Sequence, residues 1–182
     1  MKKAPEILNT REVARSRIFR VEELELRFSN GTVVHYERLL SGRHGAVLVV
    51  PLLDADTVLL IREYAAGTQR YELALPKGLV DDGEDLLQAA NRELKEEIGH
   101  GARELRHINT LSVAPGYLQH CTHIILAREL YEERLPGDEP EEIEIVPWSL
   151  RRLEALTARE DCTEARSIAA LYMVRELLRH ET

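Results

Sequence analysis

Three glutamates and an arginine in the stretch RELKEEIG, residues 92–99, have the spacing of groups that share one helical face. Glu93 and Glu97 are four residues apart and therefore lie one turn apart, and Glu96 lies beside them. Like charges at this spacing repel one another and favour a shared cation. Oxygen ligands select a hard divalent ion that also accepts substrate phosphate. The pattern predicts a Mg²⁺ site, or a Mn²⁺ site, although a solvated, charge-rich helix explains these four residues equally well.

The flanking residues predict the helix that must position these carboxylates. Its apolar stripe is formed by Leu87, Ala90, Leu94 and Ile98. Asp81 followed by Glu84 has the spacing of an altered capping box, so we expect the helix to begin near Asp81. Gly99 suits the left-handed residue that ends a helix. Arg92, four residues before Glu96, is placed to hold the carboxylates from outside the ion shell.

Composition excludes several classes of protein. The chain has 182 residues, 24 Lys and Arg, and 32 Asp and Glu, which gives a net charge of -8. An acidic surface argues against long nucleic acids as partners, because their affinity depends on phosphate neutralisation. The apolar run 46–53 is far shorter than the ~20 residues that span a bilayer, and the N-terminus lacks the apolar core of a signal peptide. We therefore expect a cytoplasmic protein that does not bind membranes.

Periodicity along the chain predicts an α/β fold. Alternating apolar residues on both sides of Asn30-Gly31 predict an N-terminal β-hairpin within residues 17–40, preceded by a loose polar segment over 1–14. Around the glutamate-bearing helix we expect further strands at 45–53, 57–64, 71–75, 103–113, 121–131 and 146–148. Two C-terminal helices are expected at 149–158 and 163–180. This order predicts an α/β/α sandwich around a mixed β-sheet, divided into a hairpin segment, 1–44, and a catalytic domain, 45–182.

The complete string beginning at Gly78 resembles the Nudix box, GX5EX7REUXEEXGU, where U is apolar. Glu84 and residues 92–99 match it, and His100, where a bulky apolar residue belongs, is the one departure. The segments REYAAGT, SVAPGY and GDEPE, together with Pro115 sixteen residues after Gly99, are similar to the ADP-ribose pyrophosphatase branch, and in particular to the bacterial ADP-compounds hydrolase type. The resemblance covers most of the chain.

What this resemblance implies is Mg²⁺-dependent hydrolysis of the pyrophosphate bond in ADP-ribose, NADH and diadenosine triphosphate, with AMP as one product. It implies Glu93 and Glu97 as metal ligands, Glu96 as a third ligand with a catalytic part, and the carbonyl of Lys77 or Gly78 completing the shell. Arg92 is expected to support catalysis, and Glu84 lies outside the ion shell. The general base is expected in the acidic loop beyond the box, as Glu139, with Glu141 as its helper or as a further ligand.

The resemblance also implies a homodimer, in which the N-terminal hairpin crosses to the partner subunit. By this resemblance, Phe19 and Arg38 fall near the adenine site of such a dimer. Their side chains suit that role, because adenine stacks on aromatic and guanidinium faces. Arg43 and Arg62 are expected at strand ends facing the box, as phosphate contacts, and Pro115 beside the substrate. Each of these residues has an alternative interpretation as an ordinary core or surface residue.

Two other functions fit parts of the sequence. A hydrolase of dinucleoside polyphosphates or of RNA 5′ ends also carries the Pro76-Lys77-Gly78 sequence before the box, although the acidic composition argues against RNA. A ligand sensor with the same fold would bind nucleotide without cleaving it. Such sensors lose box carboxylates or gain a DNA-binding domain, and this chain shows neither change. Catalysis is therefore the better prediction.

Overall fold

The structure is a computed structural model, and it describes residues 2–42, 44–137 and 140–181. The chain forms two compact units: the first is Met1–Gly45 with Ser112–Cys121, and the second is Ala46–Leu111 with Thr122–Thr182. Compactness alone does not define a domain, so the division into 1–44 and 45–182 stays a prediction.

The second unit is built on two small sheets. The first is a mixed sheet with strand order β7-β4-β10-β8, made of β4 (Ala46–Pro51), β7 (Lys77–Leu79), β8 (His100–Ser112) and β10 (Cys121–Glu132). In it, β4 pairs parallel to β10 and antiparallel to β7. The second is an antiparallel sheet with order β11-β5-β6, made of β5 (Thr57–Ala65), β6 (Arg70–Ala74) and β11 (Glu144–Ser149). The single predicted sheet is therefore divided in two.

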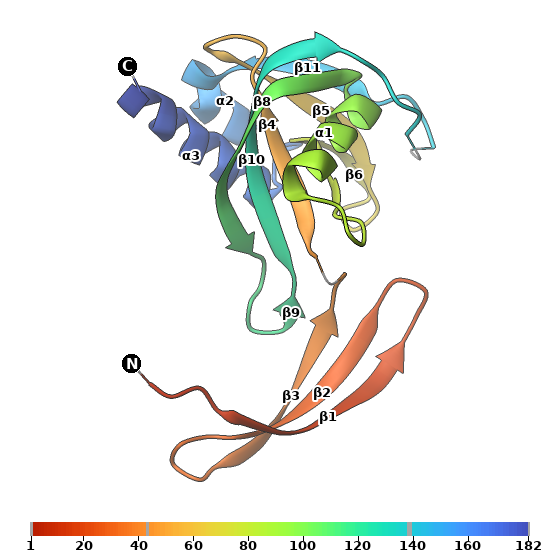
Figure 1. Cartoon of the computed structure of the whole chain (residues 1–182), viewed down its shortest axis with the longest axis vertical. Coiled ribbons are helices and arrows are strands. Elements are labelled where there is room, and N and C mark those ends of the chain that lie inside the picture. The colour runs from red at the N-terminus through yellow and green to blue at the C-terminus, as the bar shows by residue number, and fades with distance from the viewer. Residues whose placement is uncertain (1, 43, 138–139, 182) are drawn as a thin grey trace. The chain divides into compact units, whose positions relative to one another are not determined.

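Helices cover both sides of these sheets (Figure 1). They are α1 (Leu86–Glu97), the short 3₁₀ helix η1 (Leu150–Arg152), α2 (Leu153–Thr157) and α3 (Ala165–Glu181). Alternate residues of β4 serve the two sides: Leu48 and Val50 pack in the core of α2 and α3, whereas Val47 and Val49 pack against α1. The α/β/α class is confirmed. Within the described residues, no helix has the length and apolar composition that crossing a bilayer requires.

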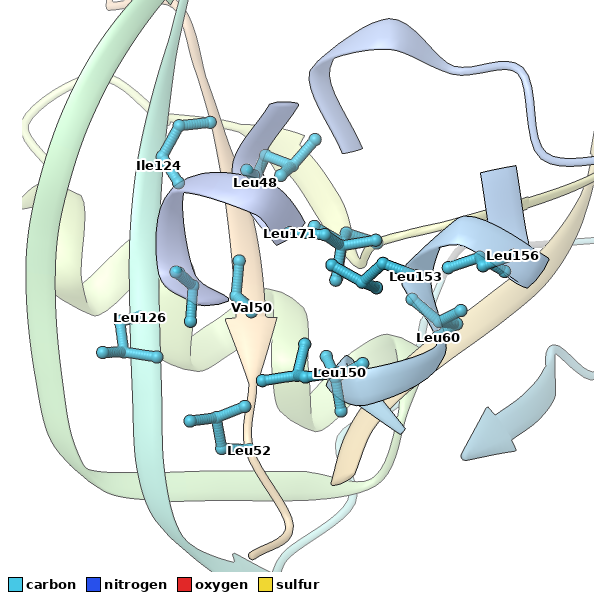
Figure 2. Packing of buried hydrophobic residues seen from close by; sticks show 14 of the residues in the cluster. Leu48, Val50, Leu52, Leu60, Ile124, Leu126, Leu150, Leu153, Leu156 and Leu171 are labelled. Atoms are coloured by element: carbon cyan, nitrogen blue, oxygen red, sulfur yellow. The ribbon is translucent and has the colours of Figure 1, made fainter. Parts of the chain in front are cut away.

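Leucines dominate the core on the α2 and α3 side (Figure 2). Leu48 and Val50 of β4 and Leu60 of β5 are at most 1% exposed there. They meet the helices through Leu153 of α2 and Leu171 of α3. Full burial of each such side chain stabilises the fold by about 1.5–3 kcal/mol, so this core anchors β4 and β5 firmly.

The first unit is a four-stranded sheet with order β1-β2-β3-β9, made of β1 (Glu6–Arg15), β2 (Arg20–Arg27), β3 (Val33–Leu40) and β9 (Leu118–Gln119). The hairpin predicted at Asn30-Gly31 is confirmed: Gly31 has φ +86°, and the Phe28 amide donates to the Thr32 carbonyl at 2.9 Å. The expectation of a loose N-terminus is wrong, because residues 6–15 pair antiparallel with β2. This strand is almost wholly exposed, so it lacks the apolar alternation that would have revealed it.

Candidate active site

Helix α1 carries the predicted carboxylates, but it begins later than predicted. Its N-cap is Asp85, whose side chain accepts a hydrogen bond from the Leu87 amide at 2.9 Å, and Gln88 closes the capping box. The predicted cap, Asp81, lies in the preceding turn, where its amide donates to Glu84 Oε2 at 3.2 Å. Gly99 has φ +67° just beyond the helix, as expected. The helix therefore starts at Leu86, and the stretch from Asp81 leads into it.

Two of the carboxylates on α1 are buried. Glu93 is 8% exposed and Glu97 is 4% exposed. Glu97 Oε2 accepts a hydrogen bond from the Lys77 amide at 2.9 Å, which ties the helix to the start of β7. A Cβ placed on Gly78 would lie 2.0 Å from the Glu93 carboxylate, so only glycine lets the strand pass this close. The carboxylates of Glu93 and Glu97 therefore lie directly against the backbone of Lys77 and Gly78.

Arg92 ties three carboxylates together. Its Nη1 donates to Glu93 Oε1 at 2.6 Å and to Glu96 Oε2 at 2.9 Å. Its Nε and Nη2 donate to the two oxygens of Glu84, each at 3.0 Å, which is a bidentate pair. A further bond joins Nη2 to the Leu79 carbonyl at 3.0 Å. One guanidinium therefore fixes the rotamers of three acidic side chains.

The charges in this cluster do not balance. Burial, with smaller contributions from the neighbouring Glu93 and Glu63, raises the pKa of Glu97 to about 8 against the opposing effect of Lys77. In contrast, the hydrogen bonds from Arg92 lower the pKa of Glu84. A carboxyl held neutral by burial ionises when a cation approaches. Glu97 is thus a group whose charged form needs an additional positive partner.

All of these residues except Glu84 line a cavity of about 680 Å³ in the second unit. Its walls are formed by the ends of β5 and β7, the acidic face of α1, and the loop before β11: Glu63, Lys77, Gly78, Leu79, Asp81, Arg92, Glu93, Glu96, Glu97, Pro136, Gly137 and Pro140. Within the described part of the chain, no three acidic, His or Cys side chains converge as a complete set of metal ligands. The oxygen donors, the close approach of the Gly78 backbone and the buried Glu97 nevertheless fit a hard divalent ion.

Comparison with known families gives this cavity a context. The NUDIX domain family matches residues 42–171, and the NudE-type Nudix hydrolase N-terminal domain family matches residues 5–38. The two matched ranges together cover most of the chain. The chain belongs to the Nudix hydrolase family. It is therefore a hydrolase, and the three box carboxylates Glu93, Glu96 and Glu97 lie on α1.

Individual relatives agree with this membership. The chain is 49% identical to ADP compounds hydrolase NudE of Escherichia coli, over 96% of this chain and 94% of the relative. It is 28% identical to ADP-ribose pyrophosphatase of Bacillus subtilis, over 90% and 91% of the two chains. A crystal structure of an ADP compounds hydrolase superposes with a TM-score of 0.92 at 48% identity, covering 100% of this chain and 97% of the other. The Nudix fold is therefore shown for this chain.

The predicted substrate residues of this Nudix hydrolase do not all lie together. Arg38 and Pro115 both line a second cavity of about 330 Å³, formed entirely within the first unit. Arg38 also donates to Glu22 Oε2 from Nε at 2.8 Å. Phe19 is 55% exposed in the turn between β1 and β2, and is not among the residues that line this cavity. Phe28 and Tyr36, which we did not predict as binding residues, also line it, and so does Tyr117.

Arg62 does not face the box. Its Nε donates to Glu144 Oε2 at 2.9 Å and its Nη1 donates to Asp161 Oδ2 at 2.5 Å, in the loop between α2 and α3. The neighbouring residue, Glu63, is the one that lines the large cavity, where it pairs with Lys77 Nζ at 2.6 Å. The expectation that Arg62 faces the box is thus wrong. Successive side chains of a strand point to opposite faces, and on β5 it is Glu63 that points to the cavity.

The acidic loop is described in part. Glu141 Oε1 accepts a hydrogen bond from the Tyr71 hydroxyl at 2.6 Å, and Glu141 does not line the cavity. The predicted general base, Glu139, and the predicted phosphate contact, Arg43, lie outside the described residues. Their roles therefore stay predictions. Glu63 and Asp81 are cavity residues that we did not predict as site residues, since neither belongs to the box pattern.

Proposed function

We propose that this Nudix hydrolase cleaves the pyrophosphate bond of ADP-X compounds, ADP-ribose, NADH and diadenosine triphosphate among them, and releases AMP with a phosphorylated fragment. Mg²⁺ is the proposed ion. The observation that carries the proposal is the buried, arginine-bridged carboxylate cluster beside a cavity large enough for a diphosphate. The 49% identity to an ADP compounds hydrolase supports the substrate class.

Residues of α1 and β7 would bind the metal ion and hold its ligands in position. Glu93 and Glu97 would hold the ion, with Glu96 as a third ligand and the Gly78 carbonyl beside them. A bound divalent ion supplies charge neutralisation of phosphate oxygens and activation of water. Arg92 keeps Glu93 and Glu96 aligned through Nη1 and is itself anchored by Glu84. This preorganisation lowers the reorganisation needed when the diphosphate arrives.

A general base must remove a proton from the attacking water. We keep Glu139 in this role, because Pro136, Gly137 and Pro140 of the same loop line the cavity. Glu141 is proposed as its helper rather than as a metal ligand, since its carboxylate is hydrogen-bonded to Tyr71. A Glu139→Gln variant should lose turnover and keep the fold. Activity near that of the wild type would remove Glu139 from the mechanism.

We propose the first unit as the surface that binds the nucleoside part of the substrate. The cavity of the first unit offers Arg38 with Phe28, Tyr36 and Pro115, which is a set suited to a purine base. We propose that the active form is a homodimer, supported by exposed apolar residues on this unit, such as Ile18 at 69% and Phe19 at 55%. Size-exclusion chromatography with light scattering should give a dimer mass, and a monomer at micromolar concentration would refute the dimer.

The substrate proposal is tested by chromatographic detection of AMP. Purified protein is incubated with ADP-ribose, NADH or diadenosine triphosphate in Mg²⁺, in Mn²⁺ and in EDTA. We expect AMP in both metals and none in EDTA, with Glu97→Gln as the inactive control. Binding of ADP-ribose without any AMP would favour a sensor. If guanosine or cytidine compounds are cleaved in preference to all ADP compounds, the substrate class is wrong although the family assignment remains.

A further inference from the structure

Part of the cavity wall is a loop without regular secondary structure. Pro136, Gly137 and Pro140 line the cavity that contains the box carboxylates. We call the described residues of this loop, 133–137 and 140–142, the wall loop. An irregular segment keeps a fixed position only when hydrogen bonds from other elements hold it. Contacts from α1 and from β6 hold the wall loop in this way.

The first attachment joins the wall loop to the C-terminal end of α1. The Glu133 amide donates to the Gly99 carbonyl, and the Leu135 amide donates to the Lys95 carbonyl, each at 3.1 Å. Neither carbonyl accepts a hydrogen bond within a helix, so the amides of the wall loop supply the donors. Lys95 also forms an ion pair from Nζ to Glu133 Oε2 at 3.0 Å, with its own side chain only 16% exposed. Lys95 occupies the unspecified position of the box, directly before Glu96 and Glu97.

The second attachment joins the other end of the wall loop to β6. The Tyr71 hydroxyl donates to Glu141 Oε1 at 2.6 Å, which is a charge-assisted hydrogen bond. The Tyr71 ring packs edge-on against Tyr64 of β5, with ring centroids 5.6 Å apart. Tyr64 follows Glu63, which lines the cavity. One end of the wall loop is thus fixed to α1, and the other is fixed to β6, which contacts the cavity strand β5 through the Tyr71–Tyr64 ring pair.

We propose that Lys95 and Tyr71 are positioning residues for pyrophosphate hydrolysis, because together they fix the wall loop at a set distance from the carboxylates of α1. The inference rests on the proposed function of this site. Neither residue touches the substrate; each acts through the loop. Misplacement of a catalytic wall by about 1 Å is enough to reduce turnover strongly, since the reacting groups must stay in a near-attack geometry.

Tyr71 and Tyr64 offer a matched test. Tyr71→Phe removes a hydrogen-bonded hydroxyl and keeps the ring pair, whereas Tyr64→Phe removes a hydroxyl that has no hydrogen-bond partner among the described residues. We expect Tyr71→Phe to lower kcat about tenfold. The Mg²⁺ concentration for half-maximal rate and the melting temperature should stay unchanged, and Tyr64→Phe should behave as wild type. A Tyr71→Phe enzyme with the wild-type kcat overturns the role of Tyr71.

Lys95 is tested by rescue. Lys95→Met keeps much of the aliphatic stem and removes the charge, so we expect about a tenfold fall in kcat. Lys95→Arg should recover most of this loss, because a guanidinium also reaches Glu133. Glu133→Gln should reproduce the Lys95→Met effect, and the double variant should be no slower than either single variant. Additive losses, or no rescue by arginine, would show that Lys95 does not act through Glu133.

Hydrogen exchange separates this inference from the proposed function. If the wild type releases no AMP from any ADP compound, the proposed function fails, and exchange in peptides covering 133–142 still decides whether the loop is fixed as described. Faster exchange in Tyr71→Phe and Lys95→Met than in Tyr64→Phe supports the attachments. Equal exchange in all three variants overturns them, whatever the activity.

Discussion

Arg92 and Arg62 each join carboxylates from separate parts of the second unit, but with opposite charge balance. Arg92 faces three glutamates, beside the buried Glu97, and all but Glu84 of these carboxylates line the cavity. Arg62 joins Glu144 and Asp161, and it does not line that cavity. Both clusters would look alike in a simple count of ion pairs. They differ in the number of cationic side chains that are available to each carboxylate.

The pKa values express this difference. Asp161 accepts hydrogen bonds from Arg159 and Arg62, which hold its pKa well below the usual range. Glu97 has burial and neighbouring acids instead, which raise its pKa to about 8. A cluster that lowers the pKa of its acids stabilises the fold, whereas one that raises it is prepared to receive a ligand. An excess of buried acid is therefore the physical sign of the active site in this chain.

The largest effect is expected from Glu97→Gln. Loss of a charged ligand from the acid-rich cluster should lower kcat by about 10³-fold or more, because the remaining oxygens hold the ion poorly. Steady-state AMP release at saturating Mg²⁺ measures this, with circular dichroism to verify the fold. Activity within tenfold of the wild type would show that the excess of acid does not serve the reaction.

A matched lysine swap compares the two arginines directly. Arg92→Lys should lower kcat about 100-fold, because an ammonium cannot bridge Glu84, Glu93 and Glu96 in a fixed fork. Arg62→Lys should lower the melting temperature and leave the activity per folded molecule unchanged. Kinetics and thermal melts on both variants decide the matter. A large activity loss in Arg62→Lys would mean that the second cluster also serves catalysis.

In the absence of metal, Glu97→Gln should be more stable than the wild type. A raised carboxyl pKa means that the unfolded chain releases its proton first, so the wild type loses stability as pH rises from 4.5 to about 8. The advantage of the variant should therefore be absent below pH 4.5 and reach about 4 kcal/mol near pH 8. Denaturant titrations in EDTA across this range measure it, and a pH-independent difference would contradict the burial of an uncompensated acid.

The smallest effect is expected at Asp161. Asp161→Asn should lower the free energy of unfolding by about 1–3 kcal/mol at neutral pH, since two arginines lose their charged acceptor. The lowered pKa places this stabilisation above the ordinary aspartate pKa of 3.8, and it is lost as pH falls further and Asp161 takes up a proton. Urea melts at pH 7 and pH 3 should show the gap shrinking. A constant gap would point to packing instead of charge.

The box helix was predictable because its information is local. Glu93, Glu96 and Glu97 are fixed on one face by a spacing of three and four residues, whatever the rest of the chain does. The helix start was misplaced because Asp81 and Asp85 each have a suitable acceptor three residues later, and both local bonds form. Local pattern alone does not choose between two such turns.

The Arg62 cluster was not predictable for the opposite reason. Its hydrogen bonds join residues 82 and 99 positions apart in the sequence. β5 is buried on both sides at Val58, Leu59, Leu60 and Ile61, so no apolar alternation shows which face Arg62 takes. The pairing of β5 with β6 and β11, which divides the expected single sheet, is likewise set by distant partners. Pairing over such distances leaves no short periodic signal.

Strand β4 has no solvent-facing side: every residue from Ala46 to Pro51 is buried, with neighbours on both faces. A slip of one position would exchange the residues that serve α1 for those that serve α3. Evolution therefore has little freedom to lengthen or shorten this strand. Any length change near it must be absorbed in the exposed bend at residues 53–55, where an added residue would leave both cores untouched.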